Sequence, residues 1–196
     1  PIAQVFDRDV YDCVQTEAQL DAWIAEATLA GTIAVDTETD ALDSMAAGLV
    51  GVSIATGPNR ACYIPLAHGG SDLFSDSPAQ VPMATAIAKL KRLLEDPSVL
   101  KIGHNIKYDL NVLERYGISV APIDDTMVMS FDLDAGKHNH GMDELSDRYL
   151  GHTPIPIKTL LGSGKSQVTF DKNGDQHELF IACACAFGRS SGARRA

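Results

Sequence analysis

The chain has 196 residues, of which 45% are hydrophobic, and it carries a formal net charge of −10 at neutral pH. This length suits one domain with a sizeable core, and the composition is that of a globular protein rather than a disordered or fibrous one. Because affinity for phosphates depends mainly on Lys and Arg, the acidic excess argues against tight autonomous binding to nucleic acid.

The sequence carries no sign of a membrane segment or of disulfide cross-links. No apolar run approaches the length of a membrane span, and the first residues do not form a secretory signal. The four cysteines form no C-x-x-C pair and indicate neither a zinc site nor a disulfide framework. We therefore expect a cytoplasmic protein with no membrane partner. Because the chain begins with Pro1 and not with Met, we also expect a piece of a longer protein or a processed product.

The first third of the chain predicts one helix followed by a strand meander. A capping-box pattern at residues 16–19 predicts a helix that ends at Gly31. Three apolar, β-branched segments joined by short links follow, which predicts three consecutive antiparallel strands at residues 32–40, 49–55 and 61–66.

The remainder alternates helical patterns with one further strand. A loop rich in Gly, Ser, Asp and Pro is expected at residues 68–82. A fourth strand is predicted at residues 99–103, and Asn105 is the expected N-cap of the helix that follows. The predicted helices span residues 83–95, 106–116, 123–133 and 142–150. Together with the meander, this order predicts a mixed α/β fold.

The first candidate site lies at the end of the predicted strand at residues 32–40. Asp36 and Glu38 stand two residues apart, so their side chains point to the same face of the strand. At about 4 Å and an effective dielectric near 20, two such charges repel by roughly 4 kcal/mol. No Lys or Arg lies between Arg8 and Arg60 to neutralise them. A divalent cation would offset the repulsion; the alternative is one capping carboxylate and one solvated carboxylate.

A third carboxylate, Asp109, lies just inside a predicted helix that begins after the fourth strand. Sites in open α/β sheets gather at the carboxyl ends of the strands, so Asp36, Glu38 and Asp109 are candidates for one cation cluster. The alternative is that Asp109 only favours the N-terminus of its helix through the helix dipole, an effect of under about 1 kcal/mol.

Three segments in this order resemble the 3′–5′ proofreading exonuclease domain of bacterial DNA polymerase I. Residues 36–53 are similar to the first exonuclease motif of that family, residues 103–109 to the second, and residues 125–170 to its helical stretch. The resemblance implies a ribonuclease H-like α/β fold, in which helices flank a mixed sheet made of an antiparallel three-strand meander plus parallel strands. A nuclease of this kind is compatible with a negative net charge, because its metal ions face the phosphate.

The resemblance also implies a mechanism. Asp36, Glu38 and Asp109 would be the catalytic residues and would hold two Mg²⁺ or Mn²⁺ ions roughly 4 Å apart. One ion would lower the pKa of the attacking water and the other would stabilise the leaving 3′ oxygen. Hard carboxylate ligands without a Cys ligand favour Mg²⁺ or Mn²⁺ over zinc.

The partners implied by the resemblance are the 3′ end of single-stranded DNA and a polymerase domain in the same chain. Leu42 matches an apolar residue that wedges against the terminal bases. Asn105, Tyr108 and Lys137 match positions that hold the frayed strand, and Ile157 stands where the family often has an aromatic residue. Without the resemblance, Leu42 and Tyr108 would be interpreted as core residues and Lys137 as a solvated charge.

The sequence departs from the family at its third motif, a Tyr-x-x-x-Asp on a helix that follows the segment ending at Phe170. No Tyr occurs after Tyr149, and residues 171–180 contain no such spacing. We therefore expect an exonuclease-like domain over residues 1–171, a divergent tail over residues 172–196, and weak or absent activity. A changed reading frame near Lys172 is our hypothesis for the tail.

Several residues could in principle replace the lost motif. His138 and Asp143 form the H-x₄-D of a sister exonuclease branch, but His104 and Asp109 share that spacing. The candidate substitutes for the lost acidic ligand are Asp125, Asp171 and Asp175. The Gly-Ser-Gly-Lys-Ser at residues 162–166 lacks the first Gly of a phosphate-binding loop and is read as a turn.

Two other functions remain open from sequence. The domain could be a catalytically inactive scaffold that braces a polymerase, although such a scaffold has no need of the three acidic residues. It could also be a ribonuclease D-like exonuclease that acts on RNA.

Overall fold

The computed structural model describes residues 10–69, 79–151, 153, 159 and 162. Its helices in this part of the chain are α1 (Glu17–Ala30), α2 (Met83–Leu94), α3 (Lys107–Arg115), α4 (Thr126–Asp134) and α5 (Met142–Leu150). Its strands are β1 (Asp12–Cys13), β2 (Thr32–Thr39), β3 (Leu49–Gly57), β4 (Arg60–Pro65), β5 (Leu100–Gly103) and β6 (Ile123–Asp125). None of the described helices is long and apolar enough to cross a membrane.

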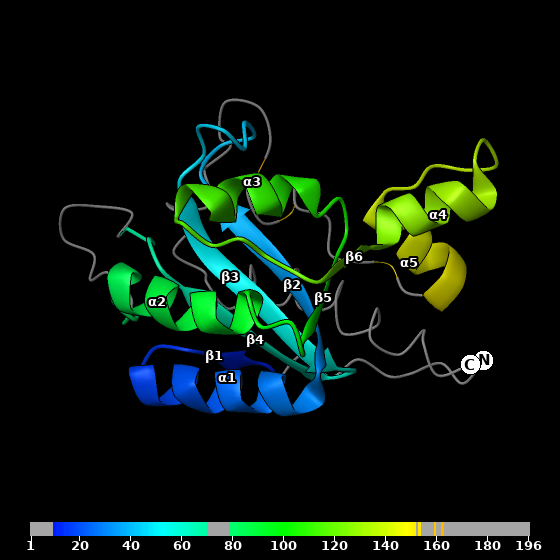
Figure 1. The fold of residues 1–196 in the computed structure, drawn as a ribbon. Coiled ribbons are helices and arrows are strands. Elements are labelled where there is room, and N and C mark those ends of the chain that lie inside the picture. Colours follow the sequence, from blue (N-terminus) through cyan, green and yellow to red (C-terminus); the bar gives the residue numbers. More distant parts are fainter. Residues whose placement is uncertain (1–9, 70–78, 152, 154–158, 160–161, 163–196) are drawn as a thin grey trace.

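The described strands form one mixed sheet in the order β1-β4-β3-β2-β5-β6. Strands β2, β3 and β4 pair antiparallel, whereas β2 with β5, β5 with β6 and β1 with β4 pair parallel. The predicted meander and the predicted mixed α/β class are therefore confirmed. Strand β2 lies in the middle of the sheet, with β3 on one side and β5 on the other (Figure 1).

Helix α1 begins and ends where its sequence predicts. The Thr16 hydroxyl accepts a hydrogen bond from the Gln19 backbone N–H, and the Gln19 Oε1 accepts one from the Thr16 backbone N–H, which completes the capping box. Gly31 ends the helix in the left-handed conformation, with φ of 67°, and β2 starts at the next residue. This tight helix-to-strand turn sets the start of the strand that carries Asp36 and Glu38.

Two local predictions were wrong. Residues 123–125 form strand β6, not the start of a helix, because they pair parallel with β5. Asn105 is not the N-cap of α3: its φ of 59° is left-handed, Ile106 takes the cap position, and no side chain caps the helix. The Asp125 carboxylate instead accepts the backbone N–H groups of Asn105 and Ile106, at 3.1 and 2.9 Å.

The two faces of the meander differ in chemistry. The face toward the helices is apolar and belongs to the main core, with Ile33 and Val35 of β2, Val52 and Ile54 of β3, and Cys62 and Ile64 of β4. The residues between these point to the second face in three cross-strand rows, Ala34–Ala55–Ala61, Asp36–Ser53–Tyr63 and Glu38–Gly51–Pro65. Asp36 and Glu38 thus belong to a face of small and polar side chains.

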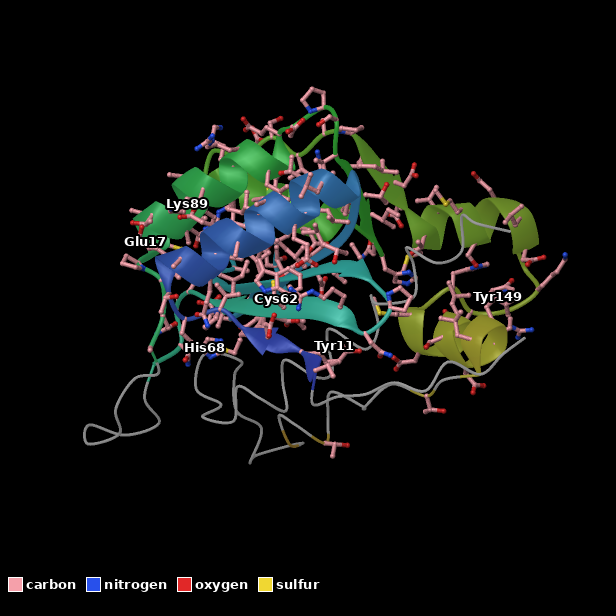
Figure 2. The ribbon with its side chains drawn as sticks, turned by 90° about the horizontal axis from the view of Figure 1, so that it is seen from below. Tyr11, Glu17, Cys62, His68, Lys89 and Tyr149 are labelled. Carbon is pink, nitrogen blue, oxygen red and sulfur yellow. The ribbon has the colours of Figure 1, made fainter. Side chains whose placement is uncertain are left out.

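The helices divide into two groups. Helices α1 and α2 lie side by side, and Figure 2 shows Lys89 of α2 next to Glu17 of α1, with Nζ and Oε2 3.8 Å apart. Helix α3 lies along the sheet near β2 (Figure 1). Helices α4 and α5 are set apart from these three, beyond strand β6 (Figure 1). The candidate site lies between the end of β2 and the start of α3.

Candidate active site

Asp36 and Glu38 are held by strand β2 on the second face of the sheet. Both side chains are half-buried, and the intervening Thr37 points to the opposite face, where it is 6% exposed. The pairing of β2 with β3 shifts register immediately after Glu38, so the regular strand ends where the two carboxylates are presented.

Asp109 reaches this strand from helix α3. It lies in the first turn of the helix and is 4% exposed. Its Oδ1 accepts hydrogen bonds from the Thr37 backbone N–H, at 2.8 Å, and from the Thr37 hydroxyl, at 2.6 Å. Since Thr37 stands between Asp36 and Glu38, these bonds fix Asp109 to the segment that carries the other two carboxylates.

The three carboxylates influence one another electrostatically. Burial raises the pKa of Asp36 well above its usual range, and the charges of Glu38 and Asp109 raise it further. Burial also raises the pKa of Asp109, to about 6, against the opposing effect of the two Thr37 hydrogen bonds. In the described part of the chain, no Lys or Arg contributes to either shift. The site therefore concentrates negative charge that the described residues around Asp36 and Asp109 do not neutralise.

Asp125 supports the start of α3 from the neighbouring strand. Besides the N–H groups of Asn105 and Ile106, its carboxylate accepts those of Met127 and Val128, at 2.8 and 3.3 Å, and so caps α4. Its charge also raises the pKa of Asp109. Because four N–H groups engage this carboxylate, it acts as a support for the site.

Tyr108 ties helix α3 to the loop after β2. Its hydroxyl donates to the Ala41 carbonyl oxygen at 2.6 Å and lies 2.6 Å from the Thr39 hydroxyl, while its ring packs against the core. The next loop residue, Leu42, is 97% exposed, which excludes the alternative that it fills the core. The loop is thus anchored at Ala41 and presents Leu42 to solvent. It follows directly after the strand that carries Asp36 and Glu38, which together with Asp109 are called the acidic cluster.

The other two candidate strand-binding residues are Asn105, which precedes β6 in the chain, and Lys137, which follows it. Asn105 is exposed at the start of α3, adjacent to the site. Lys137 is exposed in the link between α4 and α5, where it forms an ion pair with Asp134 and holds the pKa of that carboxyl down at about 2. Lys137 belongs to the helical pair set apart from the sheet, so the structure does not bring it into the acidic cluster.

The donor set of the site is the kind that a hard divalent cation requires. Carboxylate oxygens are the preferred ligands of Mg²⁺ and Mn²⁺, and burial, together with the charge of neighbouring carboxylates, raises the pKa values of Asp36 and Asp109. Within the described residues, no three His, Cys, Asp or Glu side chains are arranged to bind one ion together. One oxygen of Asp109 is engaged by two hydrogen bonds from Thr37, which reduces its capacity as a ligand. The residues fit such a cation by the chemistry of their oxygen donors.

Several residues named from the sequence lie outside the part of the chain that the structure describes: Asp171, Asp175, Ile157 and the turn at residues 163–166. His138 Nε2 lies 3.8 Å from Asp134 Oδ2, and the His138 ring is tilted by 48° against that of His140, with 4.8 Å between the ring centroids. Figure 2 shows the α4–α5 pair, marked by Tyr149, well away from Cys62 of strand β4.

Sequence reasoning missed Thr37 as a site residue. Thr37 holds Asp109 across 72 positions of sequence, a contact that no local pattern reveals. A signal was present in its position, since a Thr that alternates with two acidic residues must face the apolar side and needs a partner there.

Comparison with solved structures defines the class of fold. The chain is similar to Brucella melitensis NrnC with bound Mg²⁺, with 23% identity, a TM-score of 0.58, and coverage of 91% of this chain and 73% of that chain. It is also similar to Escherichia coli ribonuclease D, with 20% identity, a TM-score of 0.59, and coverage of 90% and 40%. These likenesses concern the fold alone, and they confirm the predicted ribonuclease H-like α/β fold.

Sequence comparison gives the family within this class. The family model described as 3′-5′ exonuclease, of the A-type DNA polymerases, matches residues 11–174. The chain therefore belongs to that exonuclease family. DNA polymerase I of Rhizobium leguminosarum is 50% identical over 179 residues. That match covers 85% of this chain, and the chain spans 18% of the length of the relative. The predicted membership is confirmed.

Proposed function

We propose that this chain is the proofreading part of a DNA polymerase I and removes nucleotides from the 3′ end of single-stranded DNA. The observation that carries the proposal is the attachment of Asp109 to Thr37, which brings the α3 carboxylate to the β2 segment that carries Asp36 and Glu38. The 50% identity to a DNA polymerase I supports it independently. We further propose that a polymerase domain belongs to the same protein and that the protein is cytoplasmic.

Asp36, Glu38 and Asp109 would hold two Mg²⁺ or Mn²⁺ ions. When bound, such ions supply Lewis-acid activation of the attacking water and stabilise charge at the leaving oxygen. Thr37 holds the Asp109 carboxylate in place through two hydrogen bonds, and Asp125 fixes the chain at the start of α3. The role of the protein is thus to keep three carboxylates adjacent despite their mutual repulsion.

The residues around this cluster are suited to hold a strand end. Leu42 offers an exposed apolar side chain on a loop that Tyr108 anchors, and Asn105 lies exposed at the start of α3. We propose that Leu42 packs against the terminal bases, that Asn105 and Tyr108 hold the strand near its end, and that Lys137 contacts it further away.

The experiment uses a single-stranded oligonucleotide labelled at its 5′ end, with protein in excess over DNA and Mg²⁺ present. We expect slow, stepwise shortening from the 3′ end, which stops when Mg²⁺ is removed and is absent in Asp36→Ala. A matched RNA oligonucleotide shortened faster than the DNA would favour a ribonuclease. Shortening by Asp36→Ala at the wild-type rate would contradict the proposed site.

Replacing Leu42 with Ala should weaken binding of a fluorescent single-stranded oligonucleotide about tenfold, since burial of a Leu side chain contributes roughly 1.5 kcal/mol. Fluorescence anisotropy measures the affinity without depending on cleavage. The matched control is Leu29→Ala, because Leu29 is 89% exposed on α1, away from the site. Equal affinities for the two variants would show that Leu42 does not contact DNA.

A further inference from the structure

Ser53 is a buried hydroxyl that the known elements of the site do not explain. It is 3% exposed, and its Oγ has no hydrogen-bond partner among the described residues. A buried polar group of this kind is rare, because loss of its hydrogen bonds to water is normally compensated within the protein. Among the described residues, Ser53 therefore lacks the partner that a buried hydroxyl normally has.

The sheet register places this hydroxyl next to Asp36. Ser53 of β3 is the cross-strand partner of Asp36 on β2, and the two side chains project to the same face. Cβ atoms of such partners lie roughly 4.5–5.5 Å apart. A hydroxyl reaches the neighbouring carboxylate by rotation about its Cα–Cβ bond.

The other neighbours of Ser53 on this face offer no better acceptor. Along β3, the flanking residues on the same face are Gly51 and Ala55, which have no polar side-chain atom. Across the sheet on β4, the partner is Tyr63, whose ring lies over Gly51 so closely that a Cβ there would collide with it. The Tyr63 hydroxyl is directed at His68 Nε2, 2.5 Å away. Of the two direct cross-strand partners of Ser53, Asp36 is thus the one whose side chain can accept its hydrogen bond.

We infer that Ser53 is a positioning residue for Asp36, and that its hydroxyl donates a hydrogen bond to the Asp36 carboxylate when that carboxylate holds its cation. This inference rests on the proposed function. Carboxylate ligands of metal ions are themselves hydrogen-bonded by surrounding groups, and the loss of such a group typically costs 10–100-fold in metal affinity or activity. Ser53 lies between Asp36 and Tyr63 in one cross-strand row, and the Tyr63 hydroxyl is held by His68.

The test measures Mn²⁺ affinity by calorimetry on the full chain. Ser53→Ala should bind Mn²⁺ about tenfold more weakly than the wild type, while its thermal midpoint in EDTA is not lowered. Ser53→Thr keeps the hydroxyl and should restore affinity to within about twofold. The matched control is Ser146→Ala, which removes another buried serine hydroxyl without a described partner, on α5. It should leave Mn²⁺ affinity unchanged.

Each other outcome overturns the inference in a distinguishable way. Wild-type Mn²⁺ affinity in Ser53→Ala, together with lost affinity in Asp36→Ala, would overturn the role of Ser53 and leave the proposed function standing. Equal losses in Ser53→Ala and Ser53→Thr, with lowered thermal midpoints in EDTA, would show a packing role. Equal Mn²⁺ binding by the wild type and Asp36→Ala would overturn the proposed function and this inference with it.

Discussion

Replacing residues 172–196 with the corresponding segment of Rhizobium leguminosarum DNA polymerase I should raise the rate of 3′ nucleotide release about 10²–10³-fold. The expected reason is that the family supplies a water-positioning Tyr and a fourth acidic ligand from a Tyr-x-x-x-Asp motif, which this chain lacks after Phe170. Single-turnover degradation of labelled single-stranded DNA in Mg²⁺ measures the two rates side by side.

The control chimera carries the same segment with the Tyr and the Asp of that motif changed to Phe and Asn. It should remain as slow as the present chain, because it regains the helix but not the two chemical groups. If the unmodified chain already matches the first chimera, the expectation of impaired activity is wrong. If both chimeras are inactive, the chain is better described as a scaffold.

Replacing Asp109 with Asn should stabilise the metal-free protein by roughly 2 kcal/mol at pH 7.5. Burial raises the pKa of Asp109 from its ordinary value of 3.8 to about 6, so the folded state binds more protons than the unfolded state between those values. Stability therefore falls as the pH rises through this window, and the wild type carries the full cost above about pH 6. Asn removes the charge and keeps an oxygen that accepts from Thr37.

Urea unfolding in EDTA at pH 7.5 and at pH 4 measures this difference. The gain should be largest at pH 7.5 and should shrink toward pH 4, where the wild-type carboxyl is protonated in the folded state. Asp132→Asn is the matched control, since Asp132 is exposed on α4, and its effect should be small at both pH values. A loss of stability in Asp109→Asn at pH 7.5 would contradict the expectation and would mean that other groups of the protein compensate the buried carboxylate.

This prediction describes a conflict between stability and function. A buried carboxylate beside two others weakens the folded state, and such clusters mark functional sites because structure alone does not favour them. The same variant that gains stability should lose divalent-cation binding, since an amide is a weaker ligand than a carboxylate.

The fold could be predicted from sequence wherever its signals are local. Thr16 and Gln19 predict the start of α1, Gly31 predicts its end, and the alternating apolar runs predict the meander. Strand β6 could not be predicted, because three residues carry no period and the pairing of Lys101 with Ile123 supplies the strand. The predicted cap of α3 was wrong for a similar reason: Asp125, twenty residues away, accepts the backbone N–H groups of Asn105 and Ile106, and Asn105 takes a left-handed conformation instead of the cap position.

The site could be predicted in part. Asp36 and Glu38 were candidates because of strand periodicity and the absence of a nearby basic residue, and Asp109 was a candidate because its helix follows the end of the fourth strand. The family resemblance favoured this interpretation of Asp109 over a helix-dipole role. The contacts that hold the site together, from Thr37 to Asp109 and from Tyr108 to Ala41, join segments far apart in sequence and emerge only in the folded chain. The proximity of Ser53 to Asp36 could not be predicted from the sequence, because it depends on the register between β2 and β3.

The central claim is that Asp36, Glu38 and Asp109 together bind divalent cations. Calorimetric titration of Mn²⁺ into the wild-type chain and into Asp36→Ala tests it most directly, because it needs neither DNA nor the third motif. We expect saturable heats for the wild type that disappear in Asp36→Ala. Indistinguishable heats for the two proteins would contradict the claim.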